Sequence, residues 1–146
     1  MNVTPAARDA DDTSTAVADG ASGPLRVLVC AAHGHLLWGL SKLVAGEWPR
    51  MLMVGAFSTL AAAEAYLRAH AAEVALLGFS AATEDQLAEL RRLCASYATA
   101  FVVLDGNPAI RTRLADARVK AVLPLDAPGA QIVATLFEVA GPAEER

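Results

Sequence analysis

The 146-residue chain is 55% hydrophobic and 19% charged, which is typical of one globular domain with enough apolar material for a core. No apolar run approaches the roughly 20 residues of a membrane-spanning helix, and residues 1–23 are polar where a signal peptide would be apolar. The net charge of −4 offers no basic surface of the kind that duplex DNA requires. We therefore expect a cytoplasmic protein without membrane contact, in which DNA is bound only through a separate domain.

Residues 1–24 differ in composition from the rest of the chain. They contain no large aliphatic residue except valine, so they cannot bury enough surface to offset the entropy lost on ordering. They hold one arginine and four aspartates, which leaves the remaining chain with a net charge of −1. We predict a disordered tail over residues 1–24, one domain over residues 25–141 and a C-terminal linker over residues 142–146.

From Leu25 onward, short apolar runs alternate with amphipathic segments, a pattern that indicates βα units around a parallel sheet. The predicted strands are residues 25–30, 51–57, 73–79, 100–104 and 119–123. The predicted helices are one between the linker 31–34 and Trp48-Pro49, one over 58–70, one opened by a capping box of Thr83 and Gln86, one over 108–117, and one from Pro128 to Gly141.

The apolar spacing within these helices predicts which residues face the sheet. The third strand is almost entirely aliphatic, so we expect it to be buried on both faces. Cys30 and Cys94 are too few for a disulfide framework, form no metal-ligand cluster and are expected to be buried. The predicted inward residues are Leu36, Leu40, Leu43 and Val44, then Leu60, Ala63 and Leu67, then Leu87, Leu90, Cys94 and Tyr97, and finally Ile132, Val133, Leu136 and Val139.

Five βα units with right-handed crossovers predict an α/β fold, a doubly wound five-stranded parallel sheet, most often in the strand order 2-1-3-4-5. Ligands bind such sheets at the carboxyl ends of the first and third strands. In this chain that edge holds Ala31, Ala32, Gly78 and, one strand over, Asp105.

Several short segments follow one another in a recognisable order between Arg26 and Gly141. They are Val27 to His33 followed by Gly39-Leu40, then residues 54–56, 73–77 and 102–104, and Asp126-Ala127-Pro128 before the last helix. In this order and spacing the chain resembles the receiver (CheY-like) domain of bacterial response regulators, in particular the NarL/FixJ type that usually precedes a helix-turn-helix. The resemblance implies a flavodoxin-like fold and a place in two-component signal transduction.

An active receiver transfers a phosphoryl group to an aspartate after the third strand, and Mg²⁺ is held there together with two acids after the first strand. The resemblance aligns all these functional positions with other residue types, so it implies the fold and argues against phosphotransfer. We expect a degenerate pseudo-receiver that is not an enzyme and binds no metal or cofactor. The substituted positions are Ala31 and Ala32 for the acid pair, Gly78 for the phosphoacceptor, Asp105 for the hydroxyl residue, and Leu125 (or, with a slip, Pro124 or Leu123) for the lysine.

Two features of this edge have alternative interpretations. Asp105 is either a relocated phosphoacceptor or, within the turn sequence of residues 105–108, a solvated or helix-capping carboxylate. His33 and His35 flank Gly34, as metal ligands or the histidine of a cobalamin-binding module would. That module needs an acid two positions before its histidine and a glycine three after it, where this chain has Ala31 and Leu36. His33 also matches a histidine common in this receiver subtype.

Apolar residues replace charges on two helices that should pack on the same face of the sheet. Leu37, Trp38 and Phe137 fall just off the inward stripes, so we predict an exposed patch that makes a homodimer or docks a partner protein. The alternative is that the helices roll by some 20 to 40° and bury these residues. A second candidate contact is a basic group that would meet an acidic partner or form a solvated face: Arg111, Arg113, Arg118 and Lys120.

These observations favour a phosphorylation-independent receiver-like domain that acts by protein contact, with itself or a partner, in bacterial signalling or transcription regulation. Two alternatives stay open. The chain is the amino-terminal part of a DNA-binding regulator, or it senses a small molecule in the emptied phosphoacceptor pocket.

Overall fold

The computed structural model describes residues 23–115 and 117–141. Residues 1–22 of the predicted tail (1–24) and the predicted linker over 142–146 lie outside these ranges. Strands and helices alternate along the chain. The strands are β3 (Leu25–Ala31), β4 (Met51–Phe57), β5 (Val74–Phe79), β6 (Ala100–Asp105) and β7 (Val119–Pro124). The helices are α1 (Gly34–Ala45), α2 (Leu60–Ala69), α3 (Glu84–Ser96), α4 (Ile110–Arg113) and α5 (Gly129–Ala140).

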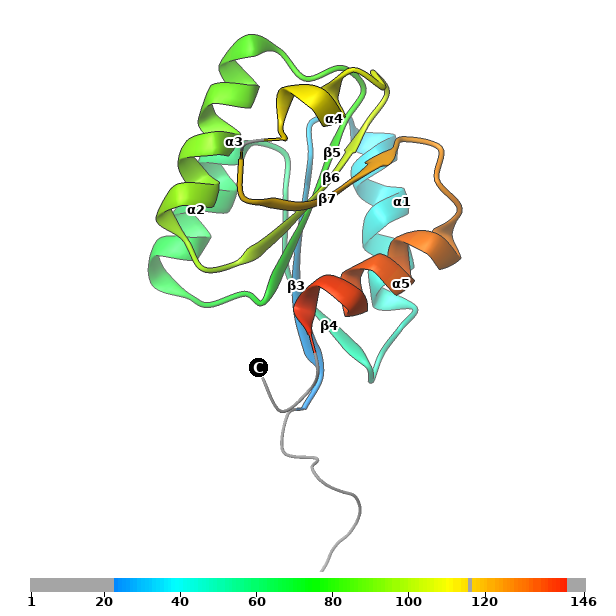
Figure 1. Cartoon of the computed structure of the whole chain (residues 1–146). Helices are drawn as coiled ribbons and strands as arrows, with labels where there is room; N and C mark the ends of the chain where they lie inside the picture. Colours follow the sequence, from blue (N-terminus) through cyan, green and yellow to red (C-terminus); the bar gives the residue numbers. More distant parts are fainter. Residues whose placement is uncertain (1–22, 116, 142–146) are drawn as a thin grey trace, which may run out of the picture.

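All five strands pair in parallel, in the order β4-β3-β5-β6-β7. Since β3 is the first of them in the chain, this is the predicted order 2-1-3-4-5, and the doubly wound fold is confirmed. Helices α1 and α5 cover one face of the sheet, while α2 and α3 cover the other (Figure 1). No helix within the described ranges is long and apolar enough to cross a membrane.

The core has two layers, one on each side of the sheet. Successive side chains of a strand point to opposite faces, so Ala75 and Leu77 pack toward α2 and α3 while Val74 and Leu76 pack toward α1 and α5. Every residue of β5 is buried, as its continuous aliphatic character predicts for a central strand. The two cysteines are free and buried, also as predicted.

Local signals in the sequence set most helix boundaries. The Thr83 side chain accepts from the Gln86 amide, and the Gln86 side chain accepts from the Thr83 amide, which completes the predicted capping box of α3. Thr59 caps α2 in the same way by accepting from the Ala62 amide. Helix α5 ends at Gly141, whose φ of 78° is a conformation that glycine adopts without strain.

The fourth helix is much shorter than predicted. A helix over residues 108–117 was expected, but α4 is a single turn, Ile110–Arg113. Asn107 accounts for the late start, because its side chain accepts from the Ala109 amide and holds residues 107–109 in a turn. Sequence spacing alone could not show how many residues that turn would take.

Candidate functional site

The carboxyl ends of the central strands meet as the topology predicts. Gly78 of β5 is the register partner of Ala31 on one side and of Leu104 on the other, and Phe79 pairs with Asp105. Ala31 is buried and Ala32 is exposed. The residues aligned with a receiver's phosphorylation site therefore do lie together at one edge of the sheet.

The space beyond Gly78 is occupied by α1. A β-carbon placed on Gly78 would lie 2.8 Å from Cδ2 of Leu36 and 3.2 Å from Cδ1 of Leu40. The first distance is shorter than van der Waals contact allows, so even a methyl group at position 78 would force Leu36 to move. The expectation of an emptied pocket is therefore wrong at this position, because two leucines fill the space that an aspartate side chain would need.

The donor atoms at this edge do not suit Mg²⁺. That ion prefers oxygen ligands in octahedral array, and the side chains of Ala31, Ala32 and Gly78 have no oxygen. Within residues 23–115 and 117–141, no three or more His, Cys, Asp or Glu side chains gather as a metal site would require. The residues present do not fit the metal that the receiver family uses.

Asp105 is buried, with 3% of its surface exposed. One carboxylate oxygen accepts from the Ala82 amide at 3.1 Å and the other from the Asn107 amide at 2.7 Å. The carboxylate thus ties the loop after β5 to the turn after β6. The expectation of a solvated or helix-capping carboxylate is therefore wrong, because Asp105 is buried and the N-cap of α4 is Ala109. Both oxygens of Asp105 bond instead to backbone amides and stabilise the turn.

His33, which follows β3, also contacts the loop after β5. Its Nε2 lies 2.9 Å from Oγ of Ser80, a contact between the segments that follow β3 and β5. Both residues are exposed, and His35 is exposed beside them on the first turn of α1. This hydrogen bond holds two loops of the edge together.

A groove of about 600 Å³ lies beside Asp105, between the turn after β6 and the end of β7. Leu125, the residue aligned with the receiver lysine, is half-buried at its wall, and its amide donates to the Asp105 carbonyl at 3.1 Å. The groove is lined by Asp105, Gly106, Asn107, Pro108, Ile110, Arg111, Val122, Leu123, Pro124, Leu125 and Asp126.

The predicted apolar patch on α1 and α5 is divided between surface and core. Trp38 is 67% exposed and the Lys42 ammonium lies 5.5 Å from its ring centroid. Leu37 and Phe137 are half-buried against the core, and the Arg50 guanidinium lies 4.8 Å from the Phe137 ring. The prediction of three exposed residues is wrong for two of them, because the helices are rotated so that Leu37 and Phe137 partly face inward.

The predicted basic group is also divided. Arg111 donates to the Val122 carbonyl at 3.0 Å, and Arg113 donates to the Glu84 carboxylate at 2.6 Å, which lowers the pKa of Glu84. Arg118 and Lys120 are exposed. All four residues are exposed, but Arg111 and Arg113 also make contacts within the domain.

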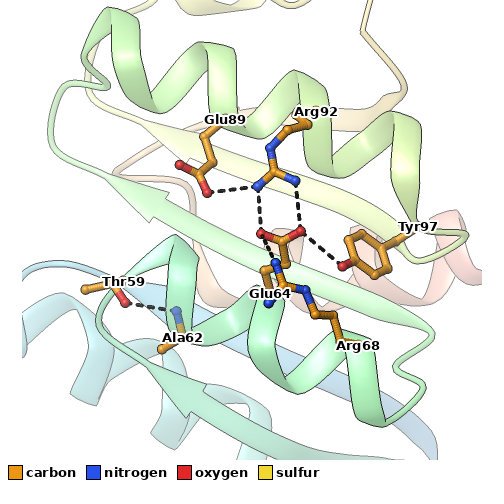
Figure 2. A network of polar contacts seen from close by, with 7 residues as sticks. All are labelled: Thr59, Ala62, Glu64, Arg68, Glu89, Arg92 and Tyr97. Atoms are coloured by element: carbon orange, nitrogen blue, oxygen red, sulfur yellow. Dashed lines mark hydrogen bonds and ion pairs between the residues drawn. The ribbon is translucent and has the colours of Figure 1, made fainter.

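A charged network between α2 and α3 was not predicted from the sequence (Figure 2). Glu64 is 6% exposed, and its carboxylate accepts two hydrogen bonds from Arg92, at 2.8 and 2.6 Å, and one from the Tyr97 hydroxyl at 3.0 Å. Arg68 lies 3.7 Å away. Bonding to Arg92, with a smaller contribution from Tyr97, lowers the pKa of Glu64 to about 2 in spite of its burial. The network joins the two helices and is structural.

Comparison with known proteins identifies the fold. No protein-family model and no curated protein matches the chain. Among solved structures, the signal receiver domain of the response regulator NarL from Mycobacterium tuberculosis superposes with a TM-score of 0.70 at 22% identity, over 80% of this chain and 96% of that one. This chain has the receiver-domain fold.

Two further receiver structures match similarly. The response regulatory domain of mrkE from Klebsiella pneumoniae has a TM-score of 0.69 at 12% identity, over 83% of this chain and 99% of that one. The response regulator RcsB of Salmonella typhimurium has a TM-score of 0.67 at 18% identity, over 79% of this chain. The match covers only 60% of the length of that RcsB chain.

Proposed function

We propose that this chain is a degenerate receiver of the NarL/FixJ type that works in bacterial signal transduction or transcription regulation without being phosphorylated. The observation that carries this proposal is the packing at Gly78, where Leu36 and Leu40 take the place of a nucleophilic carboxylate. Phosphoryl transfer to a receiver needs that nucleophile and a metal ion to neutralise charge. The residues at this edge supply neither the nucleophile nor ligands for the metal ion. The domain therefore acts as a binding module and not as an enzyme.

The face formed by α1 and α5 is the contact surface in this proposal. Tryptophan is enriched among the residues that contribute most to binding at the centre of protein–protein interfaces. Trp38 on α1 is 67% exposed and is therefore available for such a contact. A groove of about 500 Å³ runs between the end of α1 and α5, with small residues such as Ala130 and Ala134 on its α5 wall. We expect a second copy to pack here about a two-fold axis, or a partner protein to take its place.

Sedimentation of the full chain over a range of concentrations tests this surface. We expect a dimer that Trp38→Glu and Ala134→Glu each convert to a monomer, since Trp38 is exposed on α1 and Ala134 is exposed on the α5 wall of the groove. Ala61→Glu is the matched control, because Ala61 is exposed on α2, which covers the opposite face of the sheet. Acetyl phosphate with Mg²⁺ should leave the association constant unchanged. A monomer at all concentrations would exclude the homodimer, and association only after phosphoryl donor is added would refute the phosphorylation-independent function.

A second candidate is the regulatory domain of a DNA-binding protein. The observation in its favour is that RcsB structures include a complex with DNA, and this chain spans 60% of such an RcsB chain. Sequencing the gene beyond the codon for Arg146 tests it: a basic helical segment is expected, and a stop codon would exclude it.

A third candidate is a small-molecule sensor, now located in the groove beside Asp105 and not at Gly78. A thermal-shift screen of metabolites tests it, because a ligand of the folded state raises the melting temperature. An Asp126→Trp variant, which places a bulky side chain at an exposed position of the groove lining, should remove the shift.

A further inference from the structure

A groove of about 670 Å³ lies at the amino edge of the sheet, opposite the degenerate site. Its walls are the end of α2 with the loop that leads into β5, residues 67–73, and the loop between α3 and β6, residues 97–100. Lys120 near the start of β7 and the last turn of α5 close it. We call it the amino-edge groove.

Basic side chains from separate elements surround this groove. Arg68, His70 and Lys120 line it and are exposed, and Arg26 of β3 reaches its rim, where Nε lies 3.4 Å from the Ala71 carbonyl. The acid among the lining residues is Glu73. Its carboxylate already accepts from the Arg26 amide at 2.7 Å. The groove therefore has an excess of positive charge in a chain that is acidic as a whole.

The chain enters the sheet beside this groove. The Glu73 amide donates to the Arg26 carbonyl at 3.0 Å, so the start of β3 adjoins the groove wall. Figure 1 shows β3 beginning at the edge of the sheet where α5 ends. The segment that leads into β3 includes residues 9–19, which hold four aspartates and no basic residue.

The length of this segment is sufficient to reach all parts of the groove. Eleven residues separate Asp12 from Gly23 and span up to about 36 Å when extended. Lys120, on the far side, is three strands from β3, which is about 15 Å at ordinary strand spacing. A tether of this length gives an effective concentration in the millimolar range, so weak ion pairs are enough to keep the segment bound.

We propose that the acidic segment of residues 9–19 binds within its own chain to the amino-edge groove, its carboxylates paired with Arg26, Arg68 and Lys120. The segment then covers a basic surface on the side of the domain opposite the degenerate phosphorylation site. The proposal does not depend on how the α1–α5 face is used.

Paramagnetic relaxation enhancement on the full chain tests this assignment. A nitroxide attached to Ser14→Cys labels the segment selectively, because Cys30 and Cys94 are buried. We expect amide signals of residues 67–73 and 97–100 to lose intensity at low salt and to recover in 1 M NaCl, where the Debye length is about 3 Å. Replacing Asp9, Asp11 and Asp12 with Asn should restore the same signals.

The two lysines of the chain provide a matched pair of variants. Lys120→Glu, in the groove, should abolish the signal loss, whereas Lys42→Glu, an equal change of charge on α1, should leave it intact. Signal loss that is uniform over the domain, or equal in both variants, would overturn the proposal. As a further check, ¹⁵N chains without a nitroxide are mixed with nitroxide-bearing chains that contain no ¹⁵N. If the signal loss appears only in this mixture, the contact is with a second copy, and the proposal is overturned as well.

Discussion

The packing of Leu36 against Gly78 predicts that these two positions are energetically coupled. In Gly78→Ala the new methyl group would lie 2.8 Å from Leu36 Cδ2. Overpacking of a filled core costs about 1–3 kcal/mol. Replacing a glycine by alanine within a strand raises the free energy of unfolding by about 0.5–1 kcal/mol, because glycine loses more conformational entropy on folding. We therefore expect Gly78→Ala to lower the free energy of unfolding by about 0.5–2 kcal/mol, which is the difference between the two lower and between the two upper values of these terms.

The second variant, Leu36→Ala, removes the side chain that the methyl group of Gly78→Ala would contact. Leu36 is half-buried, so Leu36→Ala should cost about half of the 2–5 kcal/mol lost on truncating a fully buried leucine. In that background the methyl group at position 78 meets only Leu40 Cδ1 at 3.2 Å, which can shift. The double variant should thus be more stable than the sum of the single effects, by about 1–2 kcal/mol, within the range of coupling measured for residues in contact.

Urea denaturation followed by circular dichroism measures the free energy of unfolding of Gly78→Ala, Leu36→Ala and the double variant. The dependence of that free energy on urea concentration should be the same for all of them, so that the midpoints report stability alone. Gly39→Ala is the control, because a β-carbon at Gly39 meets nothing within 4 Å. This control should be neutral or stabilising, by up to about 1 kcal/mol, as for glycine in a helix. Additive effects at positions 36 and 78, or a neutral Gly78→Ala, would show that Leu36 does not fill the space beyond Gly78.

Two further predictions concern titratable groups. The pKa of Glu64 is lowered in the folded state to about 2, so its contribution to stability is complete above the ordinary value near 4.5 and is lost as pH falls toward 2. Urea midpoints between pH 2 and 6 should fall less steeply with acid in Glu64→Gln than in the natural chain, and parallel curves would refute the bonding described for Glu64. Burial raises the pKa of Cys30 and of Cys94 to about 11, so few thiolates form at pH 8. A thiol reagent should therefore modify them only in urea, and rapid reaction of the folded chain would contradict their burial.

The fold could be predicted from the sequence because its signals are local. The aliphatic run of β5, the capping box at Thr83 and the spacing of Leu60, Ala63 and Leu67 each fix one element, and the parallel order follows from the alternation of strands and helices. The absence of a carboxylate at Gly78 was likewise visible in the sequence.

What fills the space at Gly78 was not predictable. Leu36 was expected to face inward, but which side chain enters a gap at the end of a neighbouring strand depends on the rotation of α1 and on its rotamers. The same rotation, which a short apolar pattern does not fix, decided that Trp38 is exposed while Leu37 is half-buried.

The buried position of Glu64 was missed for a different reason. It is four residues after Leu60 and so lies on the inward stripe of α2, a signal that was present in the sequence. Its main partner, Arg92, is 28 residues away on α3, and nothing local indicates that the two side chains meet. Burial of a charge depends on such a partner, which only the tertiary structure supplies.

The most direct test of the proposed function is the intact mass of the full chain after incubation with acetyl phosphate and Mg²⁺, beside a receiver domain that has the complete set of acids. We predict that the control gains one phosphoryl group and that this chain gains none. A gain of one phosphoryl group that is lost in Asp105→Asn would contradict the proposal and would make Asp105 the phosphoacceptor.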